Sequence, residues 1–284
     1  MTQIKNPPEK PGRFNPMLND FPTRTGRSFW RLPHVRMTLL AAFIGWLYSL
    51  APADAFDFGA WNAILEKRTR VTVWEGVAYT GFDYAGLAES DEFTRLIDDL
   101  DAYPLRSLHG RDETIAFWIN VYNIFAVNVV SRHFPIRGIK DAGGLLSPVW
   151  TMPAGKVDGT TYTLDGIEEG ILRPLNEPGI HFAIVCASVS CPDLRAQAYT
   201  PQTLKEQLAS QTRTFLQNRD KGMRIDDTAK VIHLSMLFDW YERDFAPQGG
   251  VRAFINAHRG DRPPIPGSYA VRSLPYRWDL NVVR

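Results

Sequence analysis

The sequence predicts an α+β fold, a predominantly helical single domain with a small β-sheet, over residues 56–284. Apolar residues make up 44% and aromatic residues 12% of the 284 residues, which is enough for a sizeable core. Segments with helical periodicity outnumber short segments with strand character. The two kinds do not alternate regularly, so a doubly wound parallel sheet is not expected.

The first part of this domain predicts a helix and a pair of strands. Residues 56–68 alternate apolar and polar side chains with a helical period. Residues 71–74 and 77–79 contain β-branched and aromatic side chains and are separated by Gly76, so we expect two short strands joined by a turn.

Two helices follow. In residues 91–100 the apolar side chains fall three or four positions apart, as on one face of a helix. Residues 114–134 form the most apolar long segment of the domain. They predict a central, buried helix that ends before Pro135, because a proline disfavours helical backbone in the residue before it.

The middle of the chain predicts a loop, a hairpin, a helix and a strand. Glycine and proline interrupt residues 138–153, and Asp158-Gly159 then predicts a tight hairpin turn. Residues 164–172 are expected to form a short acidic helix. Residues 182–186 are a continuous apolar run, which is typical of a strand buried on both faces.

The last third predicts helices around one more strand pair. Thr200-Pro201 is typical of the start of a helix. The expected elements are a helix over 200–218, strands over 223–226 and 231–234, helices over 235–245 and 251–258, and a terminal strand over 276–281.

Residues 1–55 are predicted to be an N-terminal region with a signal peptide that is cleaved near Ala55. Arginines precede an apolar run at residues 39–50, and Ala53-Asp54-Ala55 resembles a cleavage site. The run is 12 residues long, whereas a membrane-spanning helix needs roughly 20. We therefore expect a periplasmic or secreted protein. An uncleaved anchor is the alternative, with membrane contact only in that case, and either Met1 or Met37 could be the start.

The composition argues against several classes of protein. The formal net charge is +1, from 32 basic and 31 acidic residues, so there is no electrostatic reason to expect nucleic-acid binding. The sequence contains no glycine-rich nucleotide-binding loop, no H-E-x-x-H and no G-x-S-x-G motif. No cofactor is therefore expected, and the sequence leaves partners and oligomeric state open.

The strongest chemical signal is residues 181–192, which hold the only two cysteines. Cys186 ends the apolar run, and Ser188 and Cys191 follow it. A cysteine is a nucleophile only as a thiolate, so it needs an imidazole or a positive group nearby. His181 is the nearest imidazole in sequence. In an ideal strand His181 and Cys186 face opposite sides, so they meet only if the strand ends or bulges between them.

Other interpretations of this cluster stay open. In an exported protein the two cysteines could form a disulfide, which would be a local clip because it closes so short a loop. Zinc would use His181, Cys186 and Cys191, but their spacing matches no compact zinc motif, and no metal site is predicted. His233, followed by Asp239, is another candidate base.

Asn120, Asn123 and Arg173 are candidate substrate-binding residues. The two asparagines lie one turn apart in the apolar helix, and a buried amide without a partner costs about 1–3 kcal/mol. They therefore either clamp a neighbouring loop or orient a substrate or an imidazole. Arg173 lies four residues after Glu169, the spacing of a surface ion pair. Near the cysteines it would instead bind a carboxylate or lower a cysteine pKa.

At these residues the chain resembles the domain-of-unknown-function family numbered 547. The resemblance is best over about residues 110–245 and is carried by four blocks, at 117–123, 164–173, 181–192 and 240–245, with a looser one at 276–281. It implies a known domain but no assigned reaction. His181 falls on a family motif and His233 does not, while Val185 stands where many members have a polar residue.

The predicted function is a thiol-dependent hydrolase or acyl transferase. In this prediction Cys186 is the nucleophile and His181 is the base or orienter. Ser188 and nearby backbone N–H groups stabilise the oxyanion, and Cys191 lies beside them. The competing hypothesis is a non-catalytic envelope binding or scaffold module with structural or disulfide-paired cysteines. Thiol–disulfide cycling is a third possibility, although the gap between the cysteines is wider than in C-x-x-C.

Overall fold

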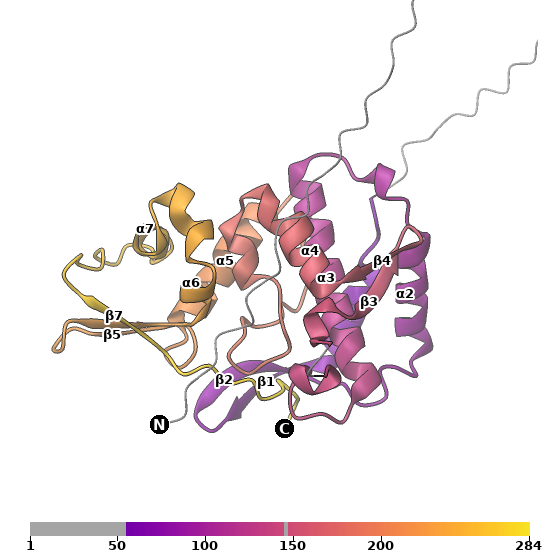
Figure 1. Ribbon diagram of the computed structural model, residues 1–284, viewed down its shortest axis with the longest axis horizontal. Coiled ribbons are helices and arrows are strands. Elements are labelled where there is room, and N and C mark those ends of the chain that lie inside the picture. The colour runs from indigo at the N-terminus through magenta and orange to yellow at the C-terminus, as the bar shows by residue number, and fades with distance from the viewer. Residues whose placement is uncertain (1–54, 145–146) are drawn as a thin grey trace, which may run out of the picture. The chain divides into compact units, whose positions relative to one another are not determined.

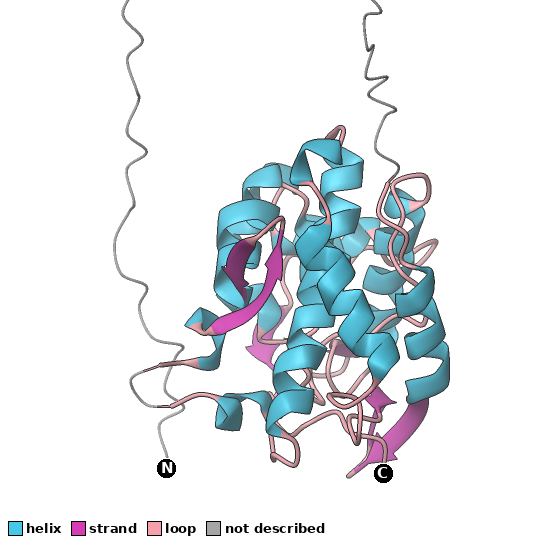
Figure 2. Ribbon diagram, turned by 90° about the vertical axis from the view of Figure 1, so that its right-hand side faces the viewer, coloured by secondary structure: helices cyan, strands magenta, loops and turns pink. Residues whose placement is uncertain are grey.

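The computed structural model describes residues 55–144 and 147–284, which belong to one compact unit (Figure 1). The predicted signal segment lies outside the described residues. The fold is α+β, as predicted: helices form most of the body, and the strands lie at its edges in small sheets (Figure 2).

The centre of the fold is the long helix α3 (Arg111–His133). Every residue from Ile115 to Ser131 is buried, so this helix has no solvent-facing side over most of its length. By length and composition α3 could cross a membrane, but 94% of its apolar window is buried inside the fold. The sequence predicted this helix and its end before Pro135.

The N-terminal elements pack on one side of the core. They are α1 (Gly59–Arg68), β1 (Thr69–Trp74), β2 (Val77–Phe82) and α2 (Asp91–Ala102). β1 and β2 form the predicted hairpin, with Thr72 opposite Tyr79. Ser90 caps α2 by accepting a hydrogen bond from the Phe93 N–H.

The middle of the chain forms a second hairpin and a helix of mixed geometry. β3 (Pro153–Val157) pairs with β4 (Thr160–Thr163), and Gly155 lets β3 pass directly over the Phe125 ring of α3. α4 (Leu164–Ile167) then widens into a π-helical turn over Glu168–Leu172. Such turns are rare and are frequent at functional sites.

The predicted strand over residues 182–186 is wrong. Pro178–Phe182 forms a 3₁₀ turn, and the chain then runs irregularly between two cores. Asn123 replaces the partner strand: its Oδ1 accepts from the Val185 N–H at 2.8 Å and its Nδ2 donates to the Ala183 carbonyl at 2.9 Å. A side chain of α3 thus satisfies the backbone groups that a sheet would otherwise pair.

The C-terminal part builds a second, smaller core around Phe182 and Phe215. It contains α5 (Leu204–Gln217), β5 (Met223–Asp226), β6 (Val231–Leu234), α6 (Leu237–Trp240), α7 (Val251–Ala257) and β7 (Ala270–Ser273). β5 and β6 pair as predicted, and β7, which the sequence did not predict, pairs parallel to β6. α5 begins at Leu204 rather than at residue 200, and α6 gives way to 3₁₀ turns after Trp240.

The predicted terminal strand over 276–281 is also wrong. This segment is extended, but it bonds to several segments in turn instead of to one strand. The Leu280 N–H donates to the Arg137 carbonyl, and the Asn281 N–H donates to the Ala187 carbonyl. The C-terminal segment therefore ties the cysteine loop to the main core.

Candidate functional site

Cys186 and Cys191 form a disulfide that closes a tight loop. Their Cα atoms are 6.2 Å apart. Ala187, inside the loop, has a left-handed φ of 57°, which turns the chain back on itself. Cys186 is half-buried, whereas Cys191 is only 3% exposed. The two cysteines therefore differ in their exposure to solvent.

Hydrogen-bond donors surround the sulfur atoms. The Cys186 N–H donates to the Cys191 Sγ at 3.1 Å, and the Tyr276 hydroxyl lies 3.3 Å from the same sulfur. The Tyr276 hydroxyl is also 3.4 Å from the Cys186 Sγ, and the Ser188 hydroxyl is 3.1 Å from it. Because a disulfide sulfur carries no proton, these hydroxyls can only donate to it.

The cysteine loop is held in place by the C-terminal segment. The Val189 N–H donates to the Asp279 carbonyl at 2.9 Å, and the Arg277 N–H donates to the Ser190 Oγ at 2.9 Å. These bonds fix the loop independently of the disulfide itself. The loop geometry therefore does not depend on the sulfur–sulfur bond alone.

His181 belongs to a second cluster and makes no hydrogen bond to either cysteine among the described residues. Its Nε2 lies 2.8 Å from the Asp244 Oδ2, and its ring stacks on Tyr241 with centroids 4.0 Å apart. The His181 Nδ1 is buried and has no hydrogen-bond partner within residues 55–144 and 147–284. The predicted base is thus oriented by a carboxylate, and these contacts are with Asp244 and Tyr241 rather than with the predicted nucleophile.

Arg173 completes this second cluster. Its guanidinium binds both oxygens of Asp244, at 2.6 and 2.7 Å, and also pairs with Glu169. Burial alone would raise the pKa of Asp244, but hydrogen bonds from His181 and Arg173 outweigh it and hold that pKa well below its ordinary value. The Asp244 hydrogen bond in turn raises the pKa of Arg173. The predicted Glu169–Arg173 pair is confirmed, and Asp244 was not predicted as its third member.

A buried carboxylate interacts with residues of both clusters. Glu168, in the π-helical turn, is 7% exposed, and its Oε1 has no hydrogen-bond partner in the described part of the chain. Burial raises the pKa of Tyr122, Tyr241 and Tyr276, and the charge of Glu168 raises each further. Glu168 thus interacts electrostatically with Tyr241, which stacks on His181, and with Tyr276, which touches both sulfurs.

The two asparagines act as clamps on neighbouring backbone. Asn120 pairs with both the N–H and the carbonyl of Tyr199, at 2.9 and 2.8 Å. Asn123 holds the segment that leads to Cys186, as described above. Each amide thus uses both its oxygen and its nitrogen to bind backbone of the protein. The arrangement matches the clamp interpretation of these residues.

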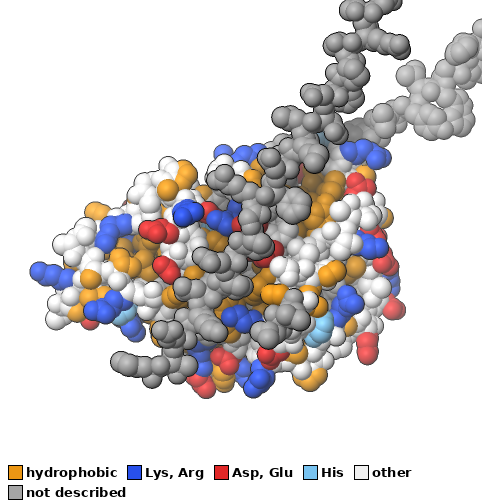
Figure 3. All heavy atoms as spheres, in the orientation of Figure 1, with side chains coloured by type: hydrophobic (Ala, Val, Ile, Leu, Met, Phe, Trp, Pro, Cys, Tyr) orange, Lys and Arg blue, Asp and Glu red, His pale blue; other side chains and the backbone are white. Residues whose placement is uncertain are grey.

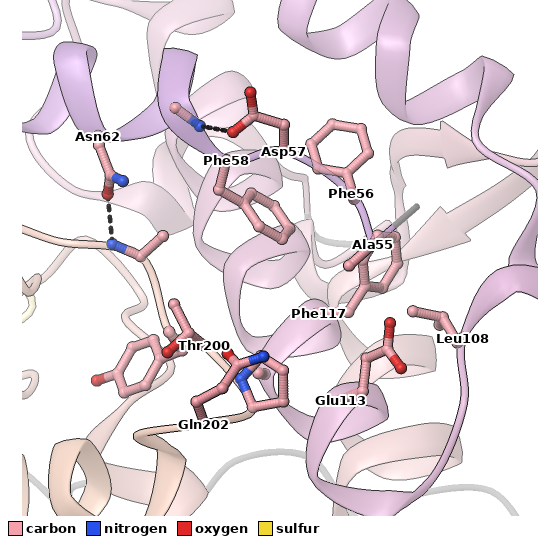
Figure 4. Close-up of a pocket in the computed structure, with 15 residues that line it drawn as sticks. Ala55, Phe56, Asp57, Phe58, Asn62, Leu108, Glu113, Phe117, Thr200 and Gln202 are labelled. Carbon is pink, nitrogen blue, oxygen red and sulfur yellow. Dashed lines mark hydrogen bonds between the residues drawn. The ribbon is translucent and has the colours of Figure 1, made fainter. Parts of the chain in front are cut away.

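Two clefts open elsewhere on the described part of the chain. One, of about 240 Å³, is lined by residues before α1, by the start of α3 and by the loop before α5 (Figure 4). In it Phe56, Phe58 and Phe117 lie near Glu113 and Thr200. The other, of about 510 Å³, lies between β6 and the helices α6 and α7. Neither is lined by a cysteine or by His181.

On the face drawn in Figure 3, side chains of both charge signs are interspersed with apolar ones. Across residues 55–144 and 147–284, no group of three His, Cys, Asp or Glu side chains is placed to hold a metal ion.

The structure therefore divides the predicted site. It brings Cys186, Ser188 and Cys191 together, and it places His181 with Arg173 around Asp244. His233, the other candidate base, lies on β6 opposite Arg224. Three residues of these clusters, Glu168, Asp244 and Tyr276, were given no function from the sequence. Each nevertheless lies in a block that carries the family resemblance: 164–173, 240–245 and 276–281, respectively.

This arrangement defines a helical α+β domain with a disulfide-closed loop at its candidate site. Residues 105–216 match the family described as protein of unknown function, DUF547. The match includes both cysteines, Glu168 and Arg173 but ends before Asp244 and Tyr276. No curated protein and no solved structure matches the chain.

Proposed function

We propose that this protein is exported and carries out thiol–disulfide exchange at the Cys186–Cys191 bond. The observation that supports this most is the difference between the two sulfurs. Cys186 is the accessible one, while Cys191 is buried and already receives two hydrogen bonds. Exchange is fastest when an accessible sulfur is attacked and the departing thiolate is stabilised.

The reaction uses a thiol as reductant. Its thiolate attacks the Cys186 Sγ, a new bond forms between these two sulfurs, and the Cys186–Cys191 bond breaks. The electron pair of the broken bond stays on the Cys191 Sγ, where the Cys186 N–H and the Tyr276 hydroxyl stabilise the charge. The thiolate of a second thiol then attacks the sulfur of the first, the mixed bond to the Cys186 Sγ breaks, and its electron pair stays on Cys186. The products are a small-molecule disulfide and two reduced cysteines, which take up the protons that the two thiols released.

Export is the setting in which this bond would persist. The predicted signal segment and the paired cysteines support the same compartment, since disulfides form and last outside the reducing cytosol. Fusing residues 1–60 to a reporter that is active only after export tests this, with a fusion that begins at residue 56 as the control. Equal activity of the two fusions would contradict export.

The exchange is tested by reduction under native conditions. The folded protein is incubated with millimolar reduced glutathione, quenched with iodoacetamide at intervals, and its alkylated cysteines are counted by mass spectrometry. We expect the disulfide to open while circular dichroism still reports a folded domain. A bond that opens only with denaturant would overturn the proposal and would favour the binding or scaffold module with a structural clip.

A hydrolase or acyl transferase is the second candidate, favoured by one observation. Asp244 orients His181, whose Nδ1 is buried without a partner, as in a dyad that awaits a nucleophile. This chemistry requires reduced Cys186 and a path between it and His181. A burst of acyl-enzyme from an activated ester, seen only after reduction and lost in Cys186→Ser and His181→Ala, would support it. A burst in either variant as large as in the reduced wild type would exclude it.

A further inference from the structure

A row of half-buried aromatic rings adjoins the disulfide. Trp150, from the loop before β3, Trp240, from α6, and Tyr276 with Trp278, from the C-terminal segment, are each only partly covered. The ring centroids of Tyr276 and Trp278 are 4.6 Å apart, and those of Trp278 and Trp150 are 6.3 Å apart. Trp240 packs on both Tyr276 and Trp278, at 4.8 and 5.7 Å.

This aromatic row is continuous with the accessible sulfur. Tyr276 is its first member, and the hydroxyl of Tyr276 is 3.4 Å from the Cys186 Sγ. The row therefore begins at the reacting atom and leads away from it. Adjacent, partly exposed tryptophan and tyrosine side chains are the residue types that dominate the energy of binding interfaces.

A positively charged side chain packs on one ring of the row. The Lys140 Nζ lies 3.3 Å from the centroid of the Trp278 ring. Burial lowers the pKa of Lys140, and within the described residues no carboxylate forms an ion pair with it. A ligand on this row would thus meet aromatic faces and one unpaired positive charge.

We propose that the aromatic row binds an extended polypeptide segment whose cysteine exchanges with Cys186, an inference that rests on the proposed exchange activity. In an extended chain, side chains two positions apart lie on one face about 7 Å from each other. In this proposal a peptide cysteine at Cys186 brings the side chain two positions away to Trp240 and Trp278, whose rings pack on Tyr276 at 4.8 and 4.6 Å. An aromatic side chain there stacks on the rings, and an adjacent carboxylate pairs with Lys140.

The test compares two short synthetic peptides that each contain one cysteine. One has tryptophan two positions from the cysteine followed by aspartate; its matched partner has serine and asparagine at those positions. The rate at which each opens the Cys186–Cys191 bond is measured by quenching with iodoacetamide. We expect the tryptophan peptide to react about tenfold faster, the ratio that one good aromatic contact supports.

Variants of the row locate the effect. Trp240→Ala and Trp278→Ala should bring the ratio of the two peptide rates close to one, whereas Trp240→Phe should keep most of it. Each peptide rate is divided by the rate of reduction by glutathione in the same variant, because Trp240 and Trp278 pack on Tyr276 and their removal also acts on the opening of the bond itself. Circular dichroism confirms that each variant is folded.

The outcomes separate this inference from the proposed function. If glutathione fails to open the bond in the folded protein, the proposed exchange is wrong. Binding to the aromatic row is then tested by tryptophan fluorescence, with the same peptides carrying serine in place of cysteine. Equal, weak quenching by both peptides overturns peptide binding by the row. If glutathione opens the bond but both peptides react equally, the row does not bind peptide. Quenching by soluble oligosaccharides but not by the peptides would assign the row to a glycan and also overturn the inference.

Discussion

The Tyr276 hydroxyl lies 3.3 Å from the Sγ of Cys191, the more buried member of the disulfide. These residues are 85 positions apart, and the bond joins the C-terminal segment to the cysteine loop. Since the phenol can only donate to a disulfide sulfur, it is already oriented for the thiolate that forms when the bond opens. Tyr276 therefore links the fold of the C-terminal segment to the chemistry of the loop.

Tyr276→Phe should slow the opening of the disulfide by glutathione by about tenfold or more, because a hydrogen bond to a charged group contributes about 1.5–3 kcal/mol. Tyr84→Phe is the matched control, since its hydroxyl donates to the Asn281 Oδ1 at 2.7 Å and touches no sulfur. Rates are measured by alkylation and mass spectrometry. Equal slowing in both variants would show that the effect is only structural.

Reducing the disulfide should weaken the fold without unfolding it. The two cysteines are separated by 5 positions, and in the chain-entropy model so small a loop contributes about 2 kcal/mol. The hydrogen bonds from the C-terminal segment to the loop remain after reduction. Urea unfolding of the oxidised protein and of the Cys186→Ala/Cys191→Ala variant measures the difference; a variant that is unfolded in buffer would contradict this account.

Asp244→Asn should lower the free energy of unfolding by about 2–4 kcal/mol at pH 7, because it leaves Arg173 and His181 without their shared carboxylate. Asp141→Asn is the control. Asp141 pairs with Arg137 at 3.7 Å on the surface, so its loss should cost less than about 1 kcal/mol. A similar cost in both variants would mean that the buried cluster contributes little.

The Asp244 contribution should also depend on pH in a defined direction. The pKa of Asp244 is lower in the folded protein than in the unfolded chain, so the carboxylate stabilises the fold fully above its unfolded pKa of about 4. That stabilisation is lost as the pH falls through the lower folded value. The difference between wild type and Asp244→Asn should thus shrink below about pH 4. A difference that grows with acid would reverse the sign and contradict the assignment.

Asn123→Ala should cost about 2–4 kcal/mol, since it leaves the Val185 N–H and the Ala183 carbonyl buried without partners. Asn128→Ala gives a graded comparison, because Asn128 makes one such bond, to the Ala154 carbonyl at 3.0 Å. Chemical denaturation measures both. The Asn123 variant should also open its disulfide at a changed rate, because the clamp ends one residue before Cys186; an unchanged rate would show that the clamp does not position the loop.

Local patterns in the sequence were enough to predict much of the fold. A continuous run of apolar residues indicates α3. Residues close in sequence form each of the strand pairs β1–β2, β3–β4 and β5–β6, so short stretches of sequence indicate these pairs as well. β7 could not be predicted in this way, because its exposed Val271 and the residues around it give no alternation of buried and exposed side chains.

The failures at the site have a common physical cause. The run before Cys186 is apolar because it passes between two cores, and its hydrogen bonds come from the side chain of Asn123, 60 residues away. Asp244 reaches Arg173 across 71 positions. Partners that are distant in sequence leave no periodic signal. The sequence could therefore predict which loop carries the chemistry, but not which residues surround it.

The central claim is that the exchange starts at Cys186 in the folded protein. The most direct measurement is peptide mapping of the glutathione adduct that is trapped by acid quenching during native reduction. This account predicts glutathione on Cys186 with Cys191 free, and less of this adduct in Tyr276→Phe. Glutathione found first on Cys191, or on neither cysteine until the domain unfolds, would contradict it.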